Sequence, residues 1–267
     1  MIRAAAAALL ALAACAEAQA PANAPVFPVE ACERRTLVDA RNGHTVLGAE
    51  DLALSEDGEQ LFVSAYDRLA VEEALTRGLA VPAGALYRMP VRALLLGDVA
   101  AQPLLAGDAV EGGLRPHGLA VSGERVALVN RTIRNGDIHG EIVEFRIAGD
   151  DPVDLHTRRE DDWCAANDVA LRRTGLAASL DRARCPGWAF GERVFGLRRG
   201  SVRSSEGGVL ADGLAFANGL ATLPDGGLAV AETRARQVRV VRPDGTERVF
   251  PVDGAPDNIN LAPDGRL

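Results

Sequence analysis

Polar side chains with the chemistry of metal ligands occur at four places in the chain, each directly before an apolar run typical of a strand. They are Glu50-Asp51, Asn167-Asp168, Asn218 and Asp257-Asn258. One such cluster alone ordinarily makes an Asx turn or caps a loop. Four clusters at equivalent strand starts offer convergent carboxylate and amide oxygens, which are the hard ligands that Ca²⁺ prefers. The sequence has no EF-hand loop and no zinc-like spacing of His and Cys, so it predicts calcium held by residues far apart in the chain.

Short alternating or wholly apolar runs dominate the rest of the chain. They predict strands at 61–63, 125–129, 141–145, 227–230 and 237–241. Turns with Asp-Gly or Gly-Glu separate these runs, because glycine accepts a positive φ without a steric penalty. Only one short segment, Val71 to Arg77, is predicted to be helical.

One unit recurs along the chain: an apolar strand, an Asp-Gly turn and a second apolar strand. The first strand and turn of its three copies occupy residues 52–58, 220–226 and 259–265. The turn glycines are therefore separated by 168 residues, which would be four steps of about 42, and by 39 residues. Propeller blades of four strands repeat at roughly 40–50 residues, and both separations fit this period. The sequence therefore predicts an all-β fold, a β-propeller of four-stranded blades, over a plain β-sandwich. The innermost strands of a propeller all begin at one face, so the four polar clusters are expected to converge on the central channel.

The clusters, together with Arg115-Pro116-His117-Gly118-Leu119, resemble the paraoxonase/arylesterase family of calcium-dependent six-bladed propellers. That family is related more distantly to the gluconolactonase and senescence-marker family, and the resemblance runs from Cys32 to the end of the chain. It implies two calcium ions. The ligands of a catalytic ion would be Glu50, Asn167, Asn218, Asp257 and Asn258. The ligands of a deeper structural ion would be Asp51, Asp168 and the backbone carbonyl of Leu119.

His117 occupies the position of the family's active-site histidine. The resemblance makes it the expected general base, because imidazole titrates near neutrality. The sequence departs from the family at Arg131, where the animal enzymes have a second histidine, since a guanidinium cannot relay a proton. A third family element is reduced here to Leu180-Asp181-Arg182, and Asp181 is expected to stand in as base or orienting group.

The predicted activity is hydrolysis of a lactone or aryl ester, with Ca²⁺ polarising the carbonyl while His117 or a carboxylate deprotonates water. No Gly-x-Ser-x-Gly motif supports a serine acyl-enzyme. Two alternatives stay open. One is a non-catalytic propeller that uses calcium as a structural ion and its face for binding. The other is a gluconolactonase-like sugar lactonase.

The resemblance to a six-bladed family also implies that the last one to two blades lie beyond Leu267. The family ties its N-terminal strand to its C-terminus with a disulfide, which would leave the partner of Cys32 in that missing part. Cys164 and Cys185 are close enough in sequence to pair with each other. Residues 32–267 are therefore expected to form one incomplete propeller domain.

The first twenty residues predict an export signal, with Arg3 before the apolar run Ala4 to Ala14. Leu12-Ala13-Ala14-Cys15 resembles a bacterial lipobox, which would make Cys15 acylated; the alternative is ordinary cleavage after Ala18-Gln19-Ala20. Residues 21–31 read as a linker. The predicted location is the bacterial periplasm, with a lipid anchor as the only membrane contact. The formal charge of −8 argues against a nucleic-acid groove, so the expected partner is a small-molecule lactone or ester.

Overall fold

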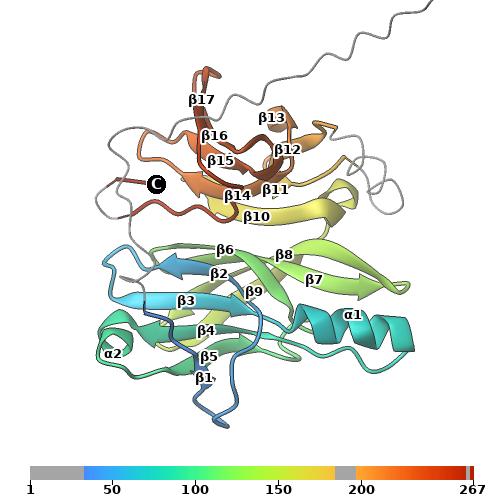
Figure 1. The fold of residues 1–267 in the computed structure, drawn as a ribbon, viewed down its shortest axis with the longest axis vertical. Helices are drawn as coiled ribbons and strands as arrows, with labels where there is room; N and C mark the ends of the chain where they lie inside the picture. The colour runs from blue at the N-terminus through green and yellow to red at the C-terminus, as the bar shows by residue number, and fades with distance from the viewer. Residues whose placement is uncertain (1–32, 184–196, 263–264) are drawn as a thin grey trace, which may run out of the picture.

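The computed structural model describes residues 33–183, 197–262 and 265–267, which form four β-sheets arranged as the blades of a propeller (Figure 1). Blade 1 contains β2 (Ala49–Leu54), β3 (Gln60–Ala65), β4 (Ala85–Pro90) and β5 (Ala100–Ala106). Blade 2 contains β6 (Pro116–Ser122), β7 (Arg125–Arg134), β8 (Asp137–Ala148) and β9 (Asp151–Arg158). Blade 3 contains β10 (Ala166–Leu171), β11 (Leu176–Leu180), β12 (Gly200–Ser204) and β13 (Val209–Leu214). Blade 4 contains β14 (Ala217–Thr222), β15 (Leu228–Glu232), β16 (Gln237–Val241) and β17 (Glu247–Pro251).

Each blade is an antiparallel meander whose strands follow chain order from the inside outward. The first strands of successive blades, β2, β6, β10 and β14, pack against one another in that order. Blade 1 lies at the bottom of Figure 1 and blade 4 at the top. The all-β class and the four-stranded blades predicted from the hairpin repeat are thus confirmed, while a ring of six blades stays a prediction.

Blade 1 carries additions that the other blades lack in the described part of the chain. Strand β1 (Val38–Asp39) runs parallel to β5 at the outer edge of the sheet. Helix α1 (Arg68–Arg77) follows β3; Asp67 caps its N-terminus through a 3.0 Å bond from Ala70 N, and Gly78 ends it with φ 64°. The sequence predicted this helix with the same last residue but with a start three residues later, at Val71. It missed α2 (Val91–Leu95), because a five-residue apolar run has no helical period to detect.

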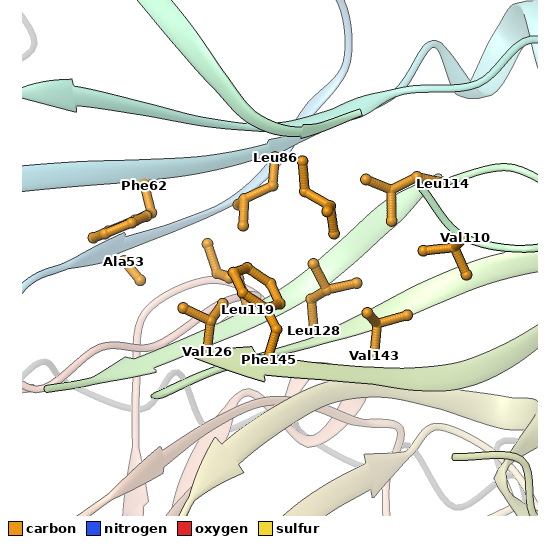
Figure 2. Close-up of a cluster of buried hydrophobic side chains, with 11 residues drawn as sticks. Ala53, Phe62, Leu86, Val110, Leu114, Leu119, Val126, Leu128, Val143 and Phe145 are labelled. Atoms are coloured by element: carbon orange, nitrogen blue, oxygen red, sulfur yellow. The ribbon is translucent and has the colours of Figure 1, made fainter. Parts of the chain in front are cut away.

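Apolar side chains fill the spaces between neighbouring blades. Phe62 and Leu86 of blade 1 lie opposite Leu128 and Phe145 of blade 2 (Figure 2), and all four are at most 3% exposed. Complete burial of such side chains stabilises the fold by about 1.5–3 kcal/mol each. Between blades 2 and 3, alanines make up much of the layer, together with valine, leucine and isoleucine side chains and one aromatic side chain, Trp163. The sheets are thereby held in fixed register around the channel.

The segment that follows blade 4 lies between the first strand of blade 4 and that of blade 1. The amide of Gly219 donates to Asp257 O at 3.0 Å, and the side chains of Asn258 and Asn260 donate to the carbonyls of Glu50 and Leu52 at 2.6 and 3.0 Å. The first two copies of the repeated unit form the predicted β2–β3 and β14–β15 hairpins. They belong to blades 1 and 4, so the 168 residues between their turn glycines span three blade steps and not the four that a period of about 42 residues predicts. In the third, residues 259–262 form no strand, and residues 263–264 are outside the described part of the chain.

Several predictions fall on residues that the structure does not describe. They concern the export signal, Cys15, the linker, Cys32 and the pairing of Cys164 with Cys185. The described residues contain no helix that is both long and apolar enough to cross a membrane.

Candidate metal and active site

The carboxylate of Asp51 connects the first strands of blades 1 and 2. Its Oδ1 accepts from Leu52 N at 2.8 Å and its Oδ2 from Leu119 N at 2.8 Å. The hydroxyl of Ser64, on the next strand of blade 1, accepts from Asp51 N at 3.0 Å and donates to His117 O at 2.5 Å. One Asp–Ser pair therefore fixes the backbone on both sides of Gly118.

The same arrangement connects blades 3 and 4. Asp168 accepts from Val169 N and Leu220 N, both at 2.7 Å. Ser179 accepts from Asp168 N at 3.0 Å and donates to Asn218 O at 2.5 Å. His117 in blade 2 and Asn218 in blade 4 are thus held in equivalent positions by two copies of one motif.

Asp51 and Asp168 are buried carboxylates without a cationic partner among the described residues. They are 5% and 2% exposed. Burial raises the pKa of Asp51 to about 7, and the nearby charge of Asp257 adds to the effect. Burial also raises the pKa of Asp168 well above its usual value, and the charge of Asp51 raises it further. Two desolvated carboxylates that repel each other suit a bound hard cation, so these residues fit the deeper calcium site implied by the sequence.

The described residues contain no cluster of three or more His, Cys, Asp and Glu side chains that could hold a metal by themselves. The predicted ligand sets are of a different kind, since they include asparagine and a backbone carbonyl. For Leu119 the structure places the backbone N–H, not its carbonyl, in direct contact with Asp51. That amide also favours the charged form of Asp168, so both carboxylates approach the same stretch of β6.

His117 and Glu50 face each other across the junction of blades 1 and 2. Nδ1 of His117 lies 3.0 Å from Oε2 of Glu50, and the two side chains are 17% and 16% exposed. The two groups are in direct contact, although they are not aligned for a hydrogen bond. Burial lowers the pKa of His117, and the positive charge of Arg131 lowers it further, against the opposing effect of Glu50. The imidazole is therefore neutral at neutral pH and able to accept a proton.

The amide of Asn218 has a defined orientation. The hydroxyl of Thr233 donates to Pro256 O at 2.8 Å, so it must accept from Asn218 Nδ2 at 3.0 Å. The same Nδ2 donates to Asp257 Oδ1 at 2.5 Å. The side-chain oxygen of Asn218 is left to face another donor or a cation, and the bond from Asn258 Nδ2 to Glu50 O orients that amide in the same way.

The predicted ligands and His117 therefore lie around one end of the channel. Asp257 bonds to Asn218, and its charge acts on both Asp51 and His117. Asn167, in the first strand of blade 3, is 6% exposed. Its side chain makes no hydrogen bond with any described residue. The structure thus brings the predicted metal ligands to one region, as the sequence expected from their positions before first strands.

Asp181, which was expected to stand in as base or orienting group, is paired with its neighbour in the chain. Its Oδ1 lies 3.3 Å from Nε of Arg182, and its charge acts on Arg131. Within the described residues, no hydrogen bond or ion pair joins Asp181 to His117. The carboxylate in direct contact with His117 is that of Glu50.

Sequence reasoning missed Tyr66, Ser64, Ser179 and Thr233. The Tyr66 ring is 4% exposed and meets the His117 ring edge-on, with centroids 6.5 Å apart. The two serines resemble ordinary strand residues. Alignment of the hairpin copies would have revealed them, because Ser64 and Ser179 follow Asp51 and Asp168 by 13 and 11 residues.

A cavity of about 690 Å³ lies along the later residues of the same first strands. Leu119 and Leu220, whose amides bind Asp51 and Asp168, contribute to its wall, so the cavity begins beside the buried carboxylates. Most of its other lining residues are aliphatic. The polar groups are therefore concentrated at one end of the channel and the aliphatic groups along the rest.

No known protein family and no curated protein matches this chain. Among solved structures, the RRP9 WD40 repeats are similar over 84% of this chain, with 16% identity and a TM-score of 0.49. A putative 6-phosphogluconolactonase from Bacteroides uniformis matches 82% of it, with 16% identity and a TM-score of 0.48. A streptogramin B lyase matches 82%, with 11% identity and a TM-score of 0.48. The chain spans 58%, 59% and 61% of those three chains. The paraoxonase resemblance stays a prediction.

Proposed function

We propose that this protein is a calcium-dependent hydrolase of lactones or aryl esters. The observation that carries the proposal is the 3.0 Å pair of His117 and Glu50, which lies at the same channel end as the bonded amide and carboxylate of Asn218 and Asp257. A neutral histidine beside a carboxylate is the arrangement of a general base. The proposal includes the six-bladed ring implied by the resemblance.

Two calcium ions would be held by the residues that the sequence singled out. Glu50 turns one carboxylate oxygen toward His117 and keeps the other for a cation. When bound by Glu50 and its neighbours, calcium would polarise the substrate carbonyl and stabilise the negative charge that develops on its oxygen. Asp51 and Asp168 would hold the second, structural ion.

The chain's own residues supply the proton transfer. With Nδ1 facing Glu50, the other ring nitrogen of His117, Nε2, accepts a proton from water. The water oxygen then forms a bond to the carbonyl carbon, and the bond from that carbon to the alcohol oxygen breaks. The leaving alkoxide takes the proton back from Nε2, which restores neutral His117. For a lactone the product is one open-chain hydroxy acid.

Turnover of phenyl acetate and of a simple lactone, with and without a chelator, tests the proposal. Asn218→Ala and Asp257→Ala should each abolish calcium binding and hydrolysis. Asp150→Ala is the control, because that side chain is 92% exposed in a turn of blade 2. Hydrolysis that survives either site variant would falsify the mechanism. Calcium binding without turnover of any ester would favour the non-catalytic binding propeller.

The proposal also places the protein outside the cytoplasm, on the strength of residues 1–20. Mass spectrometry of the mature N-terminus distinguishes the two processing routes. A lipid-modified Cys15 supports a membrane-anchored lipoprotein, whereas an unmodified chain that begins at Pro21 indicates ordinary signal cleavage.

A further inference from the structure

Arg131 is a buried cation with no bonded partner. It is 8% exposed, and its guanidinium makes no hydrogen bond or ion pair with any residue that the structure describes. Burial lowers its pKa, which reflects the free energy needed to remove the charge from water. A protein keeps such a group at a structural position only when other bonds compensate.

The other buried or shielded arginines of this chain have such bonds. Arg115, 4% exposed, donates to the carbonyls of Pro82 and Gly112 at 2.8 and 3.0 Å. Arg239, with a side chain that is 15% exposed, binds the fully buried Glu232 at 2.8 Å. Arg115 shows what a purely structural buried guanidinium looks like in this fold, and Arg131 lacks every one of those contacts.

The carboxylates closest to Arg131 are engaged elsewhere. Glu50 pairs with His117, and Asp181 pairs with Arg182 at 3.3 Å. The charges of Glu50 and Asp181 nevertheless favour charged Arg131, that of Arg182 opposes them, and the charge of Arg131 acts on His117.

Arg131 follows Asn130, which pairs with Pro116 across β6 and β7, and the Arg131 amide donates to Arg115 O at 2.9 Å. Its charge is therefore close enough to act on the candidate general base, which follows Pro116 in β6.

We propose that Arg131 binds an anionic oxygen group, a carboxylate or phosphate, carried by the substrate that His117 and Glu50 act upon. This rests on the proposed hydrolase function and narrows its substrate class from neutral esters to anionic lactones or esters. The planar guanidinium forms two parallel bonds to either group, and a site with few water molecules strengthens them. The anionic group of the substrate then forms the bonds that offset the desolvation of the Arg131 charge, which the described residues do not provide.

A matched pair of substrates tests this selectivity. γ-Butyrolactone is neutral, and 5-oxotetrahydrofuran-2-carboxylate is the same ring with a carboxylate. The wild type should prefer the second in kcat/KM by about 10- to 100-fold, mainly through KM. Arg131→Met should remove the preference, because its loss in kcat/KM should fall mainly on the carboxylated lactone and much less on γ-butyrolactone, while Arg131→Lys should retain only part of the preference. Arg92→Met, at an exposed position on α2, is the control. Equal activity of the wild type on both rings, or an equal loss on both in Arg131→Met, overturns the proposal.

A binding measurement separates this proposal from the hydrolase itself. Calorimetry in the presence of calcium measures how tightly two anions bind to the wild type and to Arg131→Met. The anions are 2-hydroxyglutarate, which is the ring-opened product, and inorganic phosphate. If neither lactone is hydrolysed, the hydrolase proposal fails, yet anion binding that Arg131→Met weakens by tenfold or more still supports the role of Arg131. Tighter binding of phosphate identifies a phosphorylated ligand. Binding of neither anion by the wild type overturns the assignment.

Thermal unfolding distinguishes a binding role of Arg131 from a structural role, because the two roles predict opposite changes in the Tm of Arg131→Met. Arg131→Met removes an uncompensated buried charge and should raise Tm, whereas Arg115→Met leaves several carbonyls without donors and should lower it. A lower Tm for Arg131→Met assigns that residue to the structure and overturns the proposal.

Discussion

The hydroxyl of Ser64, on the second strand of blade 1, donates a 2.5 Å hydrogen bond to the main-chain carbonyl of His117 on the first strand of blade 2. Ser179 makes the equivalent bond from blade 3 to Asn218 in blade 4. Both serines are fully buried and also accept from the backbone amide of an aspartate. The candidate base and a candidate calcium ligand thus owe their positions to the same kind of contact between blades.

Ser64→Ala should lower the free energy of unfolding by about 1–3 kcal/mol, because the His117 carbonyl and the Asp51 amide lose a buried partner. Chemical denaturation measures the change. Ser122→Ala removes an exposed bond to Glu56 and should stay within about 0.5 kcal/mol of the wild type. Equal changes in the free energy of unfolding for the two substitutions would show that the Ser64–His117 bond does not contribute to stability.

Asp168→Asn should have effects of opposite sign with and without calcium. In chelator the variant should unfold at a higher temperature than the wild type, because its repulsion with Asp51 and its buried charge are gone. With calcium at about 100 times its Kd, the wild type should gain about 2.7 kcal/mol and the variant much less. Thermal scans in both conditions check this. A wild type whose Tm is indifferent to calcium argues against the structural ion.

His117→Gln should lower kcat for phenyl acetate by about 10²- to 10⁴-fold, since glutamine cannot accept the proton from water. The calcium-dependent rise in Tm should persist in this variant, because the metal ligands remain. His156→Gln, on the outer strand of blade 2, serves as the control with a side chain 60% exposed. Comparable activity of both variants would remove His117 from the mechanism.

Glu232→Gln tests a buried ion network in blade 4. Glu232 accepts from Ala215 N at 2.8 Å, Arg198 at 2.7 Å and Arg239 at 2.8 Å. Burial alone would raise the pKa of Glu232, but these bonds leave it below the usual value. The charged form therefore stabilises the fold above the unfolded-state pKa, and this contribution is lost as pH falls through the lower folded-state pKa.

The substitution should accordingly cost about 3–5 kcal/mol at neutral pH, where it leaves two arginines without their anion. The difference from the wild type should shrink once the pH is well below the ordinary glutamate pKa. Denaturation at neutral and acid pH measures it. Glu247→Gln, which affects a more exposed partner of Arg239, should cost less than about 1 kcal/mol. If the two proteins differ in free energy of unfolding by the same amount at every pH, the charge of Glu232 does not cause the destabilisation.

The parts of the fold that depend on local pattern could be predicted from the sequence. Period-two runs and Asp-Gly turns indicated β3, β7, β8, β15 and β16, and the spacing of the hairpins indicated blades. Glu50, Asn167 and Asn218 were found because each begins a first strand, and first strands share one channel. The positions of residues at the start of a first strand can therefore be predicted from local sequence pattern, while their role as metal ligands stays a prediction.

The pairings between blades could not be predicted in the same way. Glu50 meets His117 only because β2 and β6 are neighbours around the ring, and no local pattern encodes that distance. The contact of Asp181 with Arg182 is likewise visible only in the structure, and its role as base or orienting group stays a prediction. Arg131 was singled out as a departure from the pattern of the family that the chain resembles, but its lack of a bonded partner among the described residues became visible only once the surrounding side chains had positions.

The segment after blade 4 is joined to blade 1 by the side chains of Asn258 and Asn260, and no backbone–backbone hydrogen bond links residues 257–261 to β2 in the described part of the chain. The junctions between blades 1 and 2 and between blades 3 and 4 have an aspartate bonded to backbone amides and a packed apolar layer. Among the described contacts between blades, that of Asn258 with Glu50 should therefore separate first. Because Asp257 and Glu50 lie on opposite sides of this contact, calcium release and separation of the two segments should be a single equilibrium.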